Sequence, residues 1–256
     1  MTTVRPAAED RITVFTTIRL LFRPESEANL ISERIVKGEP FLSDRAKRIG
    51  DSLITWSTIT VLPIAVFVFL LLPTMWLFSA VFMAAISAIL TLRELQQGVL
   101  EQVALTTLAD CDIVKGLAGG VLLRMDGWRQ SVTTALPFIV IGIGLFFSID
   151  LFGPSEWMMG LLVLAIWIML TVGIVGANIL GVVAGLWLAL RNRTLSSAAA
   201  GVALMIVYLV TALIGFVAAS RVVVVASLAA ILLMVLPFLL ATFILNQSTR
   251  WIRETA

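Results

Sequence analysis

Outside the N-terminal segment, the side chains best suited to take part in chemistry lie in one polar stretch. It is RELQQGVLEQVALTTLADCDIVKG, residues 93–116. This stretch separates two long apolar blocks and contains four carboxylates, Arg93, Lys115 and the only cysteine, Cys111. Histidine, the commonest metal ligand and general base, is absent from the chain. One cysteine excludes an intrachain disulfide and a multi-cysteine metal site. We therefore find no nucleophile–base pair or metal constellation, which argues against an intramembrane enzyme.

The residues that usually carry out nucleotide hydrolysis or ion coupling are also absent from the sequence. The chain has no Gly-x-x-x-x-Gly-Lys-Ser/Thr loop to bind phosphates, and we interpret Gly119 and Gly120 as helix-packing residues. No Asp, Glu, Lys or Arg falls in the middle of a predicted membrane span, although such residues usually mark ion or proton pathways. We predict no catalytic residue, cofactor or metal in this chain, and no proton-coupled transport.

The elements around the polar stretch are predicted to be membrane helices. The chain is 60% hydrophobic and 13% charged, whereas soluble domains carry about 25% charged residues. Its uncharged runs reach the roughly 20 residues that a membrane helix requires. The first residues, MTTVRPAAED, contain no apolar region of a signal peptide, so we expect no cleaved signal. These features predict an all-α, polytopic membrane protein.

Six spans account for the apolar runs. Pro73 lies in the middle of the uncharged run 53–92 and is expected to break it into two spans. The run 157–190 would be about 51 Å long as one helix, against a hydrocarbon core of about 30 Å. It must tilt, project from the membrane or break near Asn178. The predicted spans are about 53–72, 75–92, 132–149, 157–190, 198–219 and 222–246.

Polar segments flank this transmembrane domain of residues 53–246. In the N-terminal segment 1–52, five apolar residues fall on one helical face and predict an amphipathic helix in the membrane interface. They are Val14, Phe15, Ile18, Leu21 and Phe22. Ser43 can cap a second helix over residues 44–50. Residues 247–256 are expected to form a cytoplasmic tail.

The positive charges predict the orientation. With both termini cytoplasmic, the inner segments hold nine, four, two and two Lys/Arg, and the outer loops hold only Arg221. This distribution follows the positive-inside rule. We predict a multi-pass protein of the plasma (inner) membrane with both termini inside.

Residues 93–131 are predicted to form a cytoplasmic helix–turn–helix. Leu95, Val99, Leu100 and Val103 line one side of the first helix. Thr107 followed by Asp110 resembles a capping box, and Asp110 and Asp112 suit a helix N-terminus. The second helix has an apolar face of Ile113, Val114, Leu117, Val121 and Leu122. The alternative is an ordinary connecting loop.

Small residues recur every four positions at Gly173, Ala177, Gly181 and Gly185. This spacing allows another helix to approach closely. The partner could be a helix of the same chain or a second protomer, and the sequence leaves both open. Asn178, in the same run, is interpreted as a hydrogen-bonding packing residue, with contact to a substrate as the alternative.

The polar segment resembles the cytoplasmic stretch of permease subunits of type-2 ATP-binding-cassette (ABC) exporters. That family runs from Arg/Glu-rich residues through Gly-Thr-Leu-Glu and Thr-Pro-Leu-Ser to a helix with Glu-Ile-x-x-Gly-Lys. Here Arg93-Glu94, Gly98, Glu101 and Ile113 follow this order. The resemblance extends to GLWLALRNRTLSSAAAGVAL, residues 185–204. Thr107 stands in place of the usual proline, Ala109-Asp110 replaces the serine-containing turn, and Lys115-Gly116 reverses the usual order.

The resemblance implies that the segment contains a coupling helix, which docks on a separate ATPase subunit. It implies two permeases, identical or related, in a homodimer or heterodimer with two ATPase subunits that bind ATP and Mg²⁺. Export is the implied direction, and the partners include the lipid bilayer and no nucleic acid. The implied coupling residues are Glu94, Gly98, Glu101, Leu105, Thr106, Thr107, Leu108, Asp110 and Ile113. The competing hypothesis is a non-transporting structural subunit of a larger membrane complex.

Overall fold

The computed structural model describes residues 11–24, 30–37, 65–98, 108–127, 129, 131–132, 135, 139–140, 142–144, 157–219 and 223–255. Every regular element in these ranges is a helix. The seven helices with defined bounds are α1 (Val14–Phe22), α2 (Leu30–Lys37), α4 (Ala65–Gln96), α6 (Asp110–Arg124), α8 (Trp157–Asn192), α9 (Ser196–Ala219) and α10 (Val223–Thr255). The predicted all-α class is confirmed for this part of the chain.

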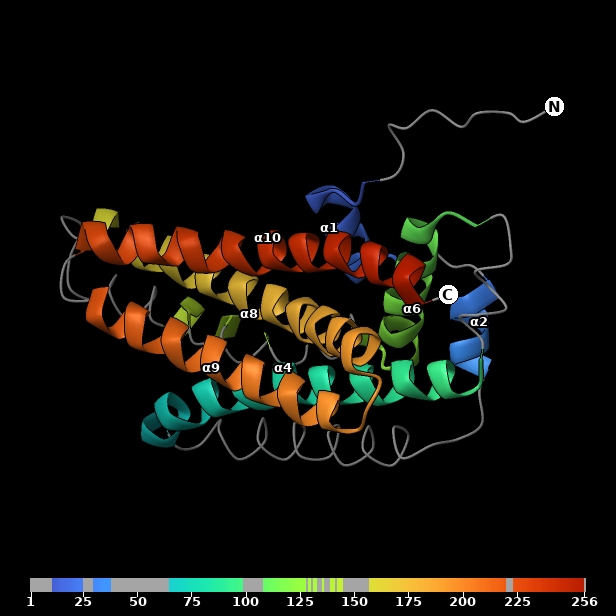
Figure 1. Ribbon diagram of the computed structural model, residues 1–256. Helices are drawn as coiled ribbons and strands as arrows, with labels where there is room; N and C mark the ends of the chain where they lie inside the picture. Colours follow the sequence, from blue (N-terminus) through green and yellow to red (C-terminus); the bar gives the residue numbers. More distant parts are fainter. Residues whose placement is uncertain are drawn as a thin grey trace.

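Four long helices, α4, α8, α9 and α10, form the main bundle (Figure 1). Each is long and apolar enough to cross a membrane. α8 contacts the other three. Large apolar side chains cover the outside of α9 and α10, among them Val207 and Leu232. Such an apolar surface is far more extensive than soluble proteins expose, and the chain is therefore a membrane-embedded protein, as predicted.

One end of the bundle carries the described polar helices and the charged ends of the long helices, and we call it the polar end. It is the end at which α4, α8 and α10 finish and α9 begins (Figure 1). Arg93, Arg191 and Arg250 belong to these helix ends. The helices α1, α2 and α6 also lie here (Figure 1).

The predicted break at Pro73 is wrong, because α4 is helical from Ala65 through Pro73 to Gln96. Proline removes a single backbone donor, and membrane helices tolerate this when neighbouring groups compensate. The remainder of the predicted span 53–72 and most of the span 132–149 lie outside the described residues. The structure therefore provides four of the six expected spans.

The long run after residue 157 is one helix, since α8 extends unbroken over 36 residues. The alternative of a break near Asn178 is excluded. Asn178 is fully buried, where its amide accepts a hydrogen bond from Ser79 (3.0 Å) and donates one to Ser131 (3.1 Å). Because both ends of the amide have partners, the polar residue joins neighbouring segments without interrupting its own helix.

The last two spans begin within two residues of their predicted positions. α10, however, continues to Thr255, so the segment 247–255 belongs to this helix and is not a separate tail. Ser248 and Ile252 are buried there, which explains why the helix continues beyond the apolar run. Burial of these two side chains stabilises the added turns of α10.

The small residues of α8 pack inside the chain. An added Cβ would overlap the carbonyl oxygen of Ala80 at Gly181, and that of Ala84 at Gly185. At Gly173 it would lie 2.8 Å from the carbonyl oxygen of Leu233 on α10. Leu233 precedes Pro237 by four residues, so its carbonyl lacks the usual helical donor. Ala177 is fully buried in the same face. These residues bring α4 and α10 against α8, and they are not available as a seam between protomers.

Candidate functional site at the polar end

The described part of the polar segment contains α6, which crosses the polar end of the bundle (Figure 1). It lies against α2, α1 and α10 and also contacts α8 and α4. A movement of α6 therefore has to be accommodated by several membrane helices. We refer to α6, α2 and the last turn of α4 as the junction.

The described part of α6 begins at Asp110. Its N-cap is Ala109, which has no side chain that could accept a hydrogen bond. Thr107, the residue on which the predicted capping box depends, lies outside the described residues. Asp110 and Asp112 do lie in the first turn, where negative charge interacts favourably with the helix dipole. This charge, together with a hydrogen bond from the Asp112 amide to the Ala109 carbonyl (2.9 Å), stabilises the start of α6.

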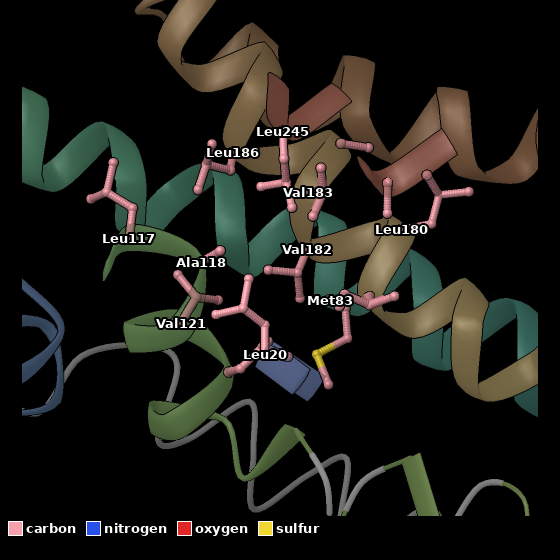
Figure 2. Packing of buried hydrophobic residues seen from close by; sticks show 14 of the residues in the cluster. Leu20, Met83, Leu117, Ala118, Val121, Leu180, Val182, Val183, Leu186 and Leu245 are labelled. Carbon is pink, nitrogen blue, oxygen red and sulfur yellow. The ribbon is translucent and has the colours of Figure 1, made fainter. Parts of the chain in front are cut away.

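α6 is enclosed by the chain on nearly all sides. The predicted apolar face, which includes Ile113 and Leu117, is buried, but Cys111, Ala118 and Gly120 on other sides are buried as well. Figure 2 shows Leu117, Ala118 and Val121 packed among residues of α1, α4 and α8. We expected α6 to rest one apolar face on the membrane. Instead, it lies inside the protein core.

Gly119 and Gly120 of α6 allow the N-terminal helices to approach. A Cβ at Gly120 would lie 2.9 Å from both Ser32 Cα and Ile35 Cδ1, so α2 crosses α6 at backbone distance there. At Gly119 the nearest atoms are Leu20 Cδ2 and the Pro24 carbonyl oxygen, both at 3.6 Å. The interpretation of Gly119 and Gly120 as packing residues agrees with this geometry.

Charged side chains hold α2 in place. Arg124, at the end of α6, donates a hydrogen bond of 2.7 Å to the Ile35 carbonyl. That carbonyl lies in the last described turn of α2. Arg34 donates to Gln97 Oε1 at 3.2 Å and places its Nε 3.4 Å from Glu94 Oε2. α2 is thus joined to both α6 and the end of α4.

Glu94 is the most enclosed charged residue in the described part of the junction. Its side chain is 10% exposed, whereas that of Arg34 is 48% exposed. The Arg34 contact lies within ion-pair distance but lacks hydrogen-bond geometry, so Glu94 Oε2 has no hydrogen-bond partner among the described residues. Such a carboxylate depends on nearby positive charge for its stability.

The other predicted coupling residues fall into three groups. Gly98 ends α4 with a φ of 66°, a left-handed conformation that glycine adopts readily. Leu108 and Asp110 are half-buried at the start of α6, and Ile113 is buried in the core. Glu101, Leu105, Thr106 and Thr107 lie outside the described residues. The structure therefore brings Glu94 and Gly98 to one end of the junction and Ile113 to its interior.

α2 and its contribution to the junction were not predicted from the sequence. The signal was present: Ile31 and Ile35 are four residues apart, Arg34 lies between them, and the turn residues Gly38-Glu39-Pro40 follow. The eight-residue helix is too short for its periodicity to stand out. Its partners on α4 and α6 lie far along the chain, which is why only the fold identified them.

The described side chains of the junction make contacts between helices. Among the described residues, no group of three His, Cys, Asp or Glu side chains is arranged to bind a metal. Its charged residues instead connect helices, and its buried residues fill the space between them.

We expect the Arg34–Glu94 pair to contribute more to docking of α2 than the nearby Lys37–Glu33 pair. Both Lys37 and Glu33 are largely exposed, so solvent screens their 3.2 Å contact. A double-mutant cycle of Arg34→Gln and Glu94→Gln should give a coupling free energy of about 1 kcal/mol, the scale for contacting charged residues. The Lys37→Gln and Glu33→Gln cycle should give about 0.3 kcal/mol. Hydrogen exchange of the α2 amides measures both, and equal values would contradict the assignment.

Comparison with protein-family models, with curated proteins and with solved structures finds no match to this chain.

Proposed function

We propose that this chain is the membrane-spanning permease subunit of an ABC exporter. A separate ATPase subunit would bind ATP and Mg²⁺, and the junction would pass its movement to the membrane helices. The polar end would then face the cytoplasm, and the complex would contain two permeases, identical or related. The resemblance of residues 93–116 to the type-2 family motivates this proposal.

The position of α6 is the observation that supports it best. α6 lies across the polar end and contacts α4, α8 and α10 through buried side chains. Close-packed side chains transmit displacement because they have little room to rearrange. A push on α6 would therefore reach three membrane helices together, as coupling requires.

The enclosure of α6 changes which of its residues could meet an ATPase. Its apolar sides are covered by the chain, so they cannot fill a groove on a partner. Leu108, Asp110 and Asp112 at its start remain partly exposed. We propose that this acidic start of α6, together with the segment that precedes it, contacts the ATPase subunit.

The enclosure also favours the second candidate function, a structural subunit of a larger membrane complex. A helix that is buried by its own chain can serve simply to brace the ends of the bundle. In that case a neighbouring membrane subunit, and no ATPase, would bind the polar end.

Purification of the intact complex in mild detergent distinguishes the two. A copurifying polypeptide with a phosphate-binding loop and ATPase activity is expected for the permease. Asp112→Arg should then lower substrate-stimulated ATPase activity about tenfold, which corresponds to about 1.4 kcal/mol, while the complex remains assembled. Glu33→Arg, a charge reversal on the exposed side of α2, is the matched control and should have little effect. Purification without any ATPase would favour the structural subunit.

A further inference from the structure

We infer that the outward side of α1 binds anionic phospholipid headgroups at the polar end of the bundle. This surface, which we call the outward face, consists of Phe15, Arg19 and Phe22, with Arg23 at the helix end. The first three are spaced at i, i+4 and i+7, so they lie on one side of a helix. All four residues are exposed.

The opposite side of α1 is already occupied by protein. Thr17, Leu20 and Leu21 are fully buried, and Leu20 reaches the core near Met83 and Val121 (Figure 2). The five apolar residues that sequence analysis assigned to one lipid-facing side are therefore divided. Leu21 faces the protein, whereas Phe15 is 75% exposed and Phe22 is 46% exposed. Two exposed phenylalanines on one side of a nine-residue helix favour an apolar environment outside the chain.

Hydrogen bonds to α10 set the depth of α1. The Asn246 side-chain amide donates to the Ile12 carbonyl (2.8 Å), and its oxygen accepts from the Ile12 amide (3.0 Å). The hydroxyl groups of Thr17 and Thr242 share a further hydrogen bond of 2.8 Å. α1 is thus tied to α10 between residues 242 and 246.

This level of α10 is where lipid exposure ends. Leu239 and Phe243 are its last large exposed apolar residues, and Arg250 is exposed two turns later. Near Arg250, the Arg191 guanidinium stacks on Trp187 and Trp251, 5.4 and 5.8 Å from the ring centres. Tryptophan and arginine are typical of the boundary between hydrocarbon and headgroups. α1 therefore lies beside that boundary.

The charge of the outward face selects the lipid. The charged side chains of the outward face itself are Arg19 and Arg23. The carboxylates that flank α1 in the sequence, Glu9, Asp10, Glu25 and Glu27, lie outside the described residues. A guanidinium matches phosphate oxygens in geometry and charge, and phenylalanines beside it would enter the acyl boundary. A negatively charged leaflet would bind the arginines through its phosphates and the phenylalanines through its acyl chains.

Spin-label accessibility tests the contact with lipid. Cysteine is introduced at Phe15, at Phe22 and, as the water-exposed control, at Glu33 on α2, in the full chain reconstituted in nanodiscs. Cys111 is buried, and unsubstituted protein measures its background labelling. Labels at 15 and 22 should be more accessible to oxygen, and less to a water-soluble nickel chelate, than the label at 33. Equal nickel access at all three positions would overturn the inference, as would labels at 15 and 22 shielded from both quenchers, which would indicate a protein partner.

The dependence on lipid charge is measured separately. Nanodiscs of phosphatidylcholine alone are compared with nanodiscs that also contain phosphatidylglycerol. Hydrogen exchange of the α1 amides should slow in the anionic lipid. Arg19→Gln and Arg23→Gln should each reduce that gain about fivefold, because a basic residue at an anionic surface contributes about 1 kcal/mol. Lys37→Gln on α2 should leave it unchanged. Identical protection in both lipids would overturn the assignment.

Discussion

Gly185→Val will separate α4 from α8 and lower the free energy of unfolding by at least about 3 kcal/mol, the upper range for overpacked cores. A Cβ at this position would overlap the Ala84 carbonyl oxygen and lie 3.0 Å from the Ala88 nitrogen. Both are backbone atoms, so no side-chain rotation can relieve the clash. α9 is close as well, since a Cβ at Gly201 would lie 3.6 Å from Gly185 Cα. Three helices would have to move apart.

Gly215→Val is the matched control for this change. Gly215 lies in α9 with no atom within 4 Å of an added Cβ. The control therefore introduces the same β-branched residue into a membrane helix without a packing conflict. SDS titration in mixed micelles, followed by circular dichroism, measures the unfolding free energy of both variants. Equal stability of the two would show that α4 and α8 do not pack at Gly185.

Gly120→Ala will release α2 from α6 and accelerate tryptic cleavage after Arg34 or Lys37 about 30-fold. The added methyl group would lie 2.9 Å from Ser32 Cα, a backbone atom that can move only with the helix. Forced backbone shifts of this kind cost about 2 kcal/mol. Cleavage within a helix requires local opening, and its rate follows the population of the open form. The rate of cleavage in the folded chain therefore measures docking of α2.

Gly119→Ala provides the control from the adjacent residue. Its nearest neighbours, at 3.6 Å, are at ordinary contact distance. Both substitutions raise helix propensity equally, by about 1 kcal/mol, so the difference between them isolates the contact with α2. Gly119→Ala should leave cleavage unchanged or slow it. Faster cleavage of Gly119→Ala than of Gly120→Ala would contradict the crossing point of α2 on α6.

Gly120→Ala, with Gly119→Ala as its control, also tests the proposed function. If the junction transmits movement, loosening α2 should also weaken the link between α6 and the end of α4, where Arg34 meets Glu94. The permease would then lose coupling in Gly120→Ala while its membrane helices stay folded. A structural subunit would instead lose partner binding.

Helical class and membrane insertion could be predicted from the amino-acid sequence because they depend on local properties. An uncharged run of about 20 residues is sufficient to indicate a span, and the starts of α9 and α10 were placed within two residues for this reason. The negative charges at the start of α6 were likewise visible, since Asp110 and Asp112 are near neighbours of the backbone that they stabilise.

Whether a residue interrupts a helix could not be read from local properties. Pro73 is predicted to break its apolar run, and a break near Asn178 is one of three alternatives for the run 157–190, yet α4 and α8 continue through both residues. Asn178 is satisfied by Ser79 and Ser131, which are distant in sequence. A polar group or proline interrupts a membrane helix only when the surrounding segments fail to compensate.

The sequence alone therefore determined that this chain is a membrane-embedded helical protein with a polar segment between its apolar blocks. The tertiary structure decided which surfaces of that segment and of α1 are occupied. Arg124 reaches Ile35 across 89 positions and Ile12 reaches Asn246 across 234. An amphipathic pattern shows that a side of a helix must be buried, but it cannot distinguish burial by lipid from burial by the rest of the chain. Only the fold showed that α6 is enclosed by protein and that α1 presents Phe15 and Phe22 outward.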